Sequence, residues 1–425
     1  MPLVQRARVL RPSFDAPQRL KIQSRAGPHL VHIRKMPAPN APTWHILTGE
    51  YPPDPGGVSD YSYSVARGLA AAGDSVHVWA PDGGAGPVDD FGVERHSLSF
   101  GFRPAVDPVA ELSQAVQRGP GPARVLLQYV PQAFGAKAMN MPLCVRLAML
   151  RRAQVWIMFH EVALGWAPLT KWRRNGVAAM HRLMANVLLA RADRVFVSIP
   201  GWETMLREMA PFWRGTATWS PIPSNLPTEV SLKASQEVRA RLPLSGYGKV
   251  LGHFGTYGSE TAQPLKRALT ALLKADSSRI ALLVGRGGEG LAKELVHEPT
   301  LAGRVAATGG LTANDAAAHL RACDVLVQPY ADGISTRRTS AMAGLALGIP
   351  MATNEGHLTE PVWRQSGAVT LAASSEELAS AVEALLADPD AAAKLAARGR
   401  ALYALRFSVD RTIERLRDKP PQGAP

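Results

Sequence analysis

The sequence contains only two cysteines among its 425 residues, Cys144 and Cys323, and they lie far apart within apolar segments. This scarcity argues against a disulfide framework and indicates a reducing compartment, with both thiols in the core. No apolar run approaches the roughly 20 residues that a membrane-spanning helix needs, and the N-terminus lacks the continuous apolar core of a signal peptide. We therefore expect a cytoplasmic protein.

Sequence motifs for several common chemistries are also missing. There is no Cys/His spacing typical of zinc sites, no Walker pattern for phosphate and no nucleophilic serine elbow. Asp89 and Asp90 are adjacent carboxylates in a glycine-rich loop, but no further ligands accompany them, which argues against a metal site there. We expect neither a metal nor a separate cofactor.

Positive charge exceeds negative charge, with 48 Lys and Arg against 35 Asp and Glu and a net charge of +13. Residues 1–42 are a basic, proline-containing extension without sustained periodicity, which predicts disorder. A transit peptide, or sequence upstream of a true start at Met36, are alternatives that stay open. No recognition motif accompanies the charge, so we do not expect nucleic acid as a partner.

A second basic zone, residues 137–194, interleaves arginines and lysines with Leu, Met, Trp and Val, and only Glu161 and Asp193 oppose them. A helix on an anionic membrane needs this interleaving, because its apolar side enters the interface while its arginines contact the headgroups. A core-facing helix with a solvated basic face has the same composition. Peripheral association with the inner face of the membrane is therefore one of two interpretations.

Residues 44–80 contain a strand, a loop, a helix and a strand. The short strand 44–47 is followed by a turn-rich loop that ends in Gly56 and Gly57, helical spacing begins at Ser59, and a strand follows at 76–80. Such a unit is parallel and right-handed, and its ligand crevice lies where the glycines meet the helix. The glycine pair would allow close approach to a phosphate, although a bare Gly-Gly is also a common turn.

The stretch 325–350 carries the strongest signal for a bound anion. A short apolar strand passes through the turn Asp332-Gly333 and becomes rich in Ala, Leu and Met with helical spacing. Arg337 and Arg338 lie where this helix begins and bring forked donors to an end whose free N–H groups already favour anions. Hydroxyls surround the pair, at Ser335, Thr336, Thr339 and Ser340. The pattern predicts a bound diphosphate; an ordinary capped helix with a solvated Arg pair is the alternative.

The alternation of strands and helices runs through both halves of the chain and restarts after the proline-rich segment 220–227. In the second half, a strand at 250–254 ends in another glycine loop with Gly255 and Thr256. We predict an α/β protein with two Rossmann-like, doubly wound domains whose glycine loops face a shared cleft. The predicted parts are an N-terminal domain (43–222), a linker (223–245), a C-terminal domain (246–402) and a final helix with a tail (403–425).

The segment EYPPDPGGVSDYSYSVARGLAAAGDSVHVWAP, residues 50–81, resembles the glycine loop and first helix of GT-B glycosyltransferases, in particular the retaining enzymes of family 4. The likeness extends over about 46–416. It implies an N-terminal acceptor domain, a C-terminal donor domain and a last helix that crosses back to the first domain. It also implies transfer of a sugar from a nucleotide-sugar donor to a carbohydrate or lipid-linked acceptor, without a metal, in the biosynthesis of a cell-surface polysaccharide or glycolipid.

The resemblance also suggests roles for individual residues. His160 ends a strand, where a side chain projects into the crevice, and it would contact the donor sugar and phosphate while Arg337 and Arg338 stabilise the leaving diphosphate. Asp60 and Tyr61 are candidates for contact with the acceptor, although Asp60 also fits a helix cap. The donor-binding candidates are Gly56, Gly57, Gly255, Thr256, Asp332, Gly333, Ser335, Thr339, Ser340 and Glu360, the last of which also fits a helix cap.

The chain departs from the resembled family at two glutamates and at a basic pair. An ungapped comparison places Ser335 and Ala343 where the glutamates would lie, and Thr256-Tyr257 replaces the Arg and Lys after Gly255. We expect the Arg pair and Asp332 to compensate. Two alternatives remain: a nucleotide-sugar 2-epimerase, for which the sequence offers no set of acid/base groups, and a catalytically divergent nucleotide-sugar-binding protein.

Overall fold

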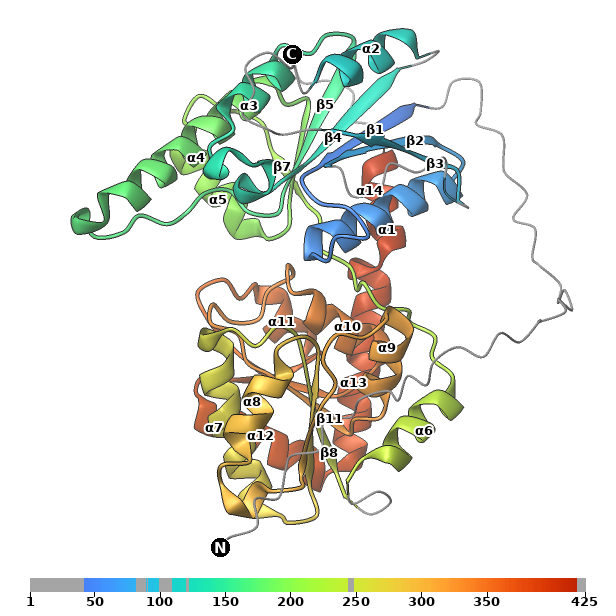
Figure 1. The fold of residues 1–425 in the computed structure, drawn as a ribbon, viewed down its shortest axis with the longest axis vertical. Helices are drawn as coiled ribbons and strands as arrows, with labels where there is room; N and C mark the ends of the chain where they lie inside the picture. Colours follow the sequence, from blue (N-terminus) through green and yellow to red (C-terminus); the bar gives the residue numbers. More distant parts are fainter. Residues whose placement is uncertain are drawn as a thin grey trace, which may run out of the picture.

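The computed structural model describes residues 42–81, 89, 91–98, 109–119, 122–243 and 248–418. They form two domains, one above the other in Figure 1, and each is a parallel sheet with helices on both faces. This arrangement confirms the predicted pair of doubly wound α/β domains. The predicted extension 1–42, except its last residue, and the end of the tail lie outside the described residues.

The N-terminal sheet has seven strands in the order β3-β2-β1-β4-β5-β6-β7. The strands are β1 (Thr43–Thr48), β2 (Ser75–Ala80), β3 (Val93–Ser97), β4 (Ala123–Tyr129), β5 (Ala153–Phe159), β6 (Arg194–Val197) and β7 (Ala217–Trp219). The central strands are continuous apolar runs because helices cover both of their faces. The short edge strands β3 and β7 lack such a run, and sequence periodicity did not predict them.

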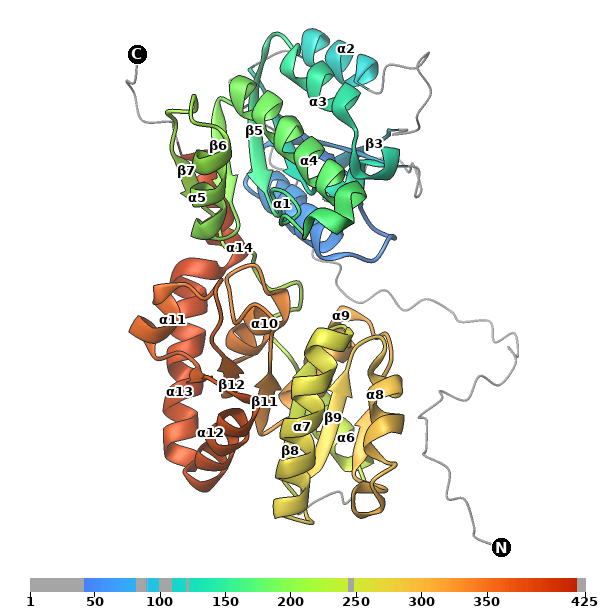
Figure 2. The same cartoon turned by 90° about the vertical axis from the view of Figure 1, so that its left-hand side faces the viewer.

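Helices cover the N-terminal sheet unequally. They are α1 (Gly57–Ala71), α2 (Ala110–Arg118), α3 (Met141–Ala148), α4 (Trp172–Arg191) and α5 (Pro200–Met209). Helices α2 to α5 share one apolar core with the sheet, which contains Cys144, and α1 packs into a second core on the opposite face. In Figure 2, α4 lies in front of the sheet and α1 lies behind it.

The C-terminal sheet has six strands in the order β10-β9-β8-β11-β12-β13. The strands are β8 (Val250–Phe254), β9 (Ile280–Val284), β10 (Val305–Ala307), β11 (Val325–Gln328), β12 (Met351–Asn354) and β13 (Thr370–Ala372). The helices are α6 (Leu232–Arg241), α7 (Ser259–Ala275), α8 (Gly288–Leu295), α9 (Ala313–Arg321), α10 (Thr339–Leu347), α11 (Pro361–Ser366), α12 (Ser375–Ala387) and α13 (Pro389–Leu402). Cores lie on both faces of this sheet, and the core beneath α9 and α10 contains Cys323.

Helix α6 falls within the range 223–245 that the sequence predicts as linker. It packs on α9 of the C-terminal domain. Arg239 fixes it there by donating hydrogen bonds to the backbone oxygens of Ala322 and Gly248, and by an ion pair with Asp324 at 3.0 Å. The segment after the prolines therefore belongs to the outer layer of the second domain.

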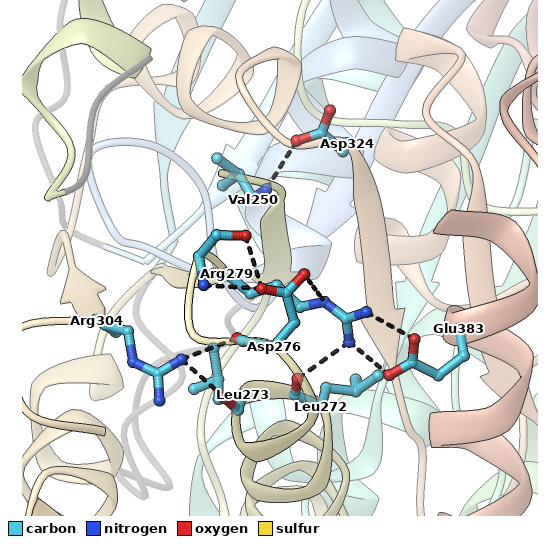
Figure 3. Close-up of polar contacts among 9 residues, drawn as sticks. Val250, Leu272, Leu273, Asp276, Arg279, Arg304, Asp324 and Glu383 are labelled. Carbon is cyan, nitrogen blue, oxygen red and sulfur yellow. Dashed lines mark hydrogen bonds and ion pairs between the residues drawn. The ribbon is translucent and has the colours of Figure 1, made fainter. Parts of the chain in front are cut away.

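Two buried arginines, Arg279 and Arg304, make polar contacts around the C-terminal end of α7, which Figure 3 shows. Arg279 donates to the backbone oxygen of Leu272 and pairs with both carboxylate oxygens of Glu383. Arg304 donates to the backbone oxygens of Leu273 and Asp276. These carbonyls lie at and just after the last turn of α7, where helical partners are missing and positive charge is favourable.

The last helix, α14 (Val409–Arg417), follows a π-helical turn at Tyr403–Phe407 and lies beside α1 of the first domain in Figures 1 and 2. Gly68 of α1 permits this close approach, because a Cβ there would lie 2.6 Å from Cγ1 of Ile413. Arg417 adds an ion pair with the buried Asp74 at 3.3 Å. The helix that the resemblance predicted to cross back therefore does so.

Candidate active site

A cleft of about 990 Å³ separates the two domains at the carboxyl ends of their strands. This is the edge at which open parallel sheets bind ligands. Loops that follow strands of both domains line it, together with the linker; the lining includes Gly56, Gly57, Asp60, Asn225, His253, Gly255, Thr256, Arg286, Thr312, Tyr330, Arg337, Arg338, Thr339 and Ser340. The structure thus brings the two predicted glycine loops and the Arg pair into one cavity.

Arg337 and Arg338 lie side by side in the cleft because Asp332 holds both. The Nη2 atoms of the two arginines donate to Oδ2 of Asp332 at 2.6 Å and 3.0 Å. The guanidinium of Arg338 also lies 5.0 Å from the centre of the Tyr330 ring, and Nη1 of Arg337 lies 3.7 Å from a carboxylate oxygen of Glu161. Two positive charges converge on one shared carboxylate.

Hydrogen bonds within the described part of the protein do not satisfy every donor of the Arg pair. Among the described residues, the Nε atoms of Arg337 and Arg338 are buried and have no hydrogen-bond partner. Burial, and then the neighbouring charge of Arg337, lower the pKa of Arg338. An anion in the cleft would relieve the repulsion between the two guanidinium groups. Asp332, predicted to bind a hydroxyl, instead orients the arginines.

The start of α10 faces the same cavity. Thr339 and Ser340 line the cleft, and no side chain caps the helix N-terminus. The hydroxyl of Ser340 is hydrogen-bonded to that of Tyr330 at 2.8 Å. The positive end of the helix dipole therefore adds to the arginines in the manner that the sequence predicts.

Gly333 shapes the loop without lining the cleft. Its φ angle is +83°, and a Cβ at this position would lie 2.2 Å from the backbone nitrogen of Gly356. Only glycine adopts this conformation in so tight a space. Its contribution to the predicted donor site is the turn that places Asp332 beneath the arginines.

Ser335 and Ala343, which an ungapped comparison aligns with the two family glutamates, lie in the interior of the protein. Ser335 and Ala343 are both completely buried and do not line the cleft. The ungapped comparison therefore aligns the family glutamates with core positions of this chain. The lack of glutamate at these two positions does not show which groups the cleft offers to a ligand. In this conformation the buried side chain of Ser335 does not reach a donor in the cleft.

Glu360 does not line the cleft; within its own domain it holds Thr336, the residue that contacts the first domain. It is buried and accepts hydrogen bonds from the backbone nitrogen of Thr336 at 2.9 Å and from Nε1 of Trp363 at 2.7 Å. Thr336 in turn contacts the first domain: its hydroxyl lies 2.8 Å from the backbone oxygen of Ser198 and accepts from Nε1 of Trp219. In this conformation Glu360 makes structural contacts directly beside the Arg pair, and its donor-binding role stays a prediction.

The first glycine loop is already occupied by a side chain that the sequence did not reveal. Oε1 of Glu50 accepts from the backbone nitrogens of Val58 and Ser59 at 3.0 Å and 3.1 Å, which caps α1. A Cβ on Gly56 would lie 2.3 Å from this oxygen, whereas one on Gly57 would meet nothing within 4 Å. Gly56 therefore makes room for the cap, and a phosphate at this helix end would compete with Glu50.

The acceptor candidates separate in the structure. Asp60 lines the cleft and accepts a hydrogen bond from Nδ2 of Asn225 at 2.7 Å, which links the first domain to the linker. Tyr61 is buried, and its ring packs edge-on against His160 with the ring centres 4.8 Å apart. Of the two, only Asp60 is exposed to a ligand in this conformation.

His160 is buried at the end of β5 and does not line the cleft. Its Nε2 is hydrogen-bonded to the side chain of Gln128 at 2.8 Å. Burial lowers the pKa of His160 to about 3, so the imidazole is neutral near pH 7. The role that the resemblance suggests for His160 stays a prediction, restricted to contacts of a neutral ring.

The second glycine loop brings an unpredicted histidine to the cleft. Nδ1 of His253 must donate to the backbone oxygen of Val327, 2.8 Å away, so Nε2 is left as an acceptor. Burial lowers the pKa of this histidine to about 4, which keeps it neutral. It precedes Gly255 and Thr256, which line the cleft as predicted. Its position inside an apolar strand concealed it in the sequence.

Comparisons with known proteins agree with this architecture. A family model described as a glycosyl transferase 4-like domain matches residues 56–217, and one described as glycosyl transferases group 1 matches residues 248–388. The two matches divide at the linker and together cover most of the chain. The fold is the GT-B fold, and by these two family matches the chain belongs to the family 4-like glycosyltransferases. No curated protein matches the chain in sequence.

Several solved structures share the fold at low sequence identity. Sucrose-phosphate synthase from Thermosynechococcus elongatus superposes with a TM-score of 0.66 at 18% identity, over 89% of this chain and 98% of that one. HepE from Anabaena, in complex with UDP and glucose, gives 0.62 at 18% identity over 88% and 98%. WaaG, a glycosyltransferase involved in lipopolysaccharide biosynthesis, gives 0.63 at 14% identity over 88% and 100%.

Proposed function

We propose that the protein transfers a hexose from a nucleotide-sugar donor to a carbohydrate or lipid-linked acceptor, with retention, in the biosynthesis of a cell-surface polysaccharide or glycolipid. The observation that carries this proposal is the Arg337–Arg338 pair on Asp332, beside the uncapped start of α10, in a cleft between the domains. HepE, which has the same fold, was solved with UDP-glucose.

The chemistry assigned to the cleft is electrostatic. Negative charge develops on the diphosphate as it leaves the sugar, and fixed donors stabilise that charge more in the transition state than in the ground state. Arg337, Arg338 and the N–H groups of α10 provide such donors. The free Nε2 of His253 suits a sugar or ribose hydroxyl, and no side chain is assigned as a covalent nucleophile.

We expect one nucleoside diphosphate or its sugar to stabilise the protein against heat. Binding to the folded state adds about 2.7 kcal/mol of stability when the ligand is present at 100 times its Kd. The measurement is the melting temperature with UDP, GDP, ADP and their sugars, for the wild type and for Arg337→Ala/Arg338→Ala. The shift should disappear in the double variant.

Arg411→Ala is the matched control, because Arg411 lies on α14 and pairs only with Glu414 near the surface. It should respond to the nucleotide as the wild type does. No shift with any nucleotide would refute the donor site and favour a different ligand. Turnover of the nucleotide sugar to its 2-epimer, without an acceptor, would favour the epimerase alternative.

We also propose that the acceptor is presented at an anionic membrane surface. The loop after β5 and the start of α4 expose Leu169 (90%), Trp172 (69%) and Trp166 (60%). Lys171, Arg173 and Arg174 are exposed beside them, and no acidic residue occurs between Glu161 and Asp193. Aromatic and apolar side chains flanked by cations suit a lipid interface.

The topology supports this location for an acceptor. A helix that follows a parallel strand begins at the carboxyl edge of the sheet, so the start of α4 lies on the same edge as the cleft. Asn175 of α4 holds the preceding loop by hydrogen bonds to the backbone of Ala167 at 2.8 Å and 3.0 Å. Among the described helices, none is long and apolar enough to cross a membrane.

Binding to vesicles of phosphatidylglycerol and phosphatidylcholine should be salt-sensitive and fall on the order of 100-fold when Lys171, Arg173 and Arg174 are all changed to glutamine, at about 1 kcal/mol per charge. Cosedimentation measures it. The control Leu232→Ala/Leu405→Ala removes equally exposed apolar groups elsewhere, at 67% and 71% exposure, and should bind normally. Equal binding to neutral vesicles would contradict the membrane proposal.

A further inference from the structure

The free edge of the N-terminal sheet carries a group of metal-ligand side chains that the cleft does not use. His77 lies on β2, and Glu94 and His96 lie on the edge strand β3. In the strand register, His77 is opposite Glu94, and His96 is the next residue of β3 on the same face. Directly opposite and diagonal side chains are within reach of one another, so pairing of these two strands assembles the group.

The distances among the three side chains suit a tetrahedral ion. Nδ1 of His77 lies 3.0 Å from Nε2 of His96 and 3.4 Å from Oε2 of Glu94, and Nε2 of His96 lies 3.6 Å from Oε1 of Glu94. Zinc bonds of 2.0–2.1 Å in tetrahedral geometry separate neighbouring ligand atoms by about 3.3 Å. The three separations bracket this value without any movement of the backbone.

Neighbouring rings hold both imidazoles in place. His96 stacks on Trp79 with the ring centres 4.0 Å apart, and His77 stacks on His45 at 4.9 Å. Nδ1 of His45 accepts from Nε1 of Trp79, so His45 acts as a support and not as a ligand. Ligands whose orientations are fixed in advance lose little freedom when an ion binds.

The site is open to an ion from outside. The side chains of His77 and His96 are 21% and 23% exposed, and that of Glu94 is 50% exposed. A neutral imidazole with a free lone pair is the form that binds a metal.

We propose that His77, Glu94 and His96 bind one divalent transition-metal ion, for which Zn²⁺ is the best match in ligand type and geometry, and that water completes its coordination. Two imidazoles and a carboxylate are ligands of borderline softness that suit zinc better than magnesium or calcium. The ion joins the edge strand β3 to β2. It is structural, because none of the three side chains lines the cleft.

This assignment leaves the expectation of metal-free sugar transfer as it was, since the site lies outside the cleft. The sequence did not predict this metal site, because its ligands are separated by irregular intervals and meet only through strand pairing. A hydrogen-bonded pair of histidines without an ion is the competing interpretation. The two interpretations differ in whether the protein takes up metal.

The test is titration of the EDTA-treated, dialysed full-length protein with Co²⁺, followed by its visible absorption, and competition with Zn²⁺. We expect one Co²⁺ per chain with the intense bands of tetrahedral coordination, displaced by Zn²⁺, and a melting temperature that rises with free Zn²⁺. Changing one ligand, in Glu94→Gln or His96→Ala, should weaken binding at least about 100-fold, since even outer partners of ligands contribute 10–100-fold.

His297→Ala is the control, because it removes an exposed histidine of the other domain and should leave uptake unchanged. Glu94→Gln preserves the size of the side chain, so retained circular dichroism with lost Co²⁺ bands separates loss of a ligand from unfolding. Absence of bands in the wild type, or bands that persist in both ligand variants, would overturn the proposal. Both outcomes are independent of donor binding and transferase activity.

Discussion

Replacing both Arg337 and Arg338 by alanine is expected to lower the rate of sugar transfer by at least about 10³-fold, because loss of one preorganised donor to a developing anion already reduces kcat by 10²–10³. The two guanidinium groups converge on Asp332, and both arginines line the cleft. Steady-state kinetics with the nucleotide sugar identified by thermal stabilisation measures the effect.

A second double variant separates charge from geometry. Arg337→Lys/Arg338→Lys preserves two positive charges but not the forked donors, so it should recover only part of kcat. Arg411→Ala on α14 should transfer sugar at the wild-type rate. If the alanine variant keeps its kcat and loses only affinity for the donor, the arginines bind the ground state and the mechanism proposed here is wrong.

Glu360→Ala is expected to lower the free energy of unfolding by about 2–6 kcal/mol, because it leaves the backbone nitrogen of Thr336 and Nε1 of Trp363 buried without an acceptor, at about 1–3 kcal/mol each. Both groups depend on Glu360 in the structure. Thr336 directly precedes Arg337 and Arg338 in the chain, so activity should fall as well. Urea unfolding followed by tryptophan fluorescence measures the stability.

Glu355→Ala is a matched control, because Glu355 lies with Glu360 in the loop between β12 and α11. Glu355 pairs with Arg364, whose side chain is 73% exposed, so its loss should change stability by less than about 1 kcal/mol. A similarly small effect of Glu360→Ala would show that the contact between the domains does not depend on this carboxylate.

The pH dependence gives an independent check on Glu360. Burial raises the pKa of its carboxyl above the ordinary value, and hydrogen bonds from Thr336 and Trp363 only partly oppose this. The folded state therefore binds the proton more tightly than the unfolded state, so this group's contribution to stability falls as pH rises through the acidic range. Glu360→Gln should lose that dependence, which unfolding curves at several pH values would reveal.

The sequence allowed the main elements to be predicted where the pattern was strong and local. The apolar runs of β1, β2, β8 and β11 and the helical spacing of α1 and α10 lie close to the predicted positions. Edge strands such as β13, with only three residues, have no sufficient pattern of their own. They form because a neighbouring strand supplies the hydrogen bonds.

Predictions that a residue lies at the cleft agree with the structure where a glycine loop or the start of a helix fixed the direction of the chain, and the binding roles stay predictions. Gly57, Thr256, Arg337 and Arg338 line the cleft as expected. They were less successful for side chains whose partners come from another element, because Glu360 and Tyr61 satisfy buried contacts instead of reaching a ligand.

The sequence by itself determined two parallel α/β domains, their order and the loop that carries the Arg pair, since each follows from short-range periodicity and turn residues. Only the tertiary structure decided that Asp332 holds both arginines, that Glu50 caps α1, and that Glu360 holds the Thr336 that contacts the first domain. It also brought His77 to Glu94 and His96. Such contacts depend on strand register and domain packing, which join residues that are distant or unpatterned along the chain.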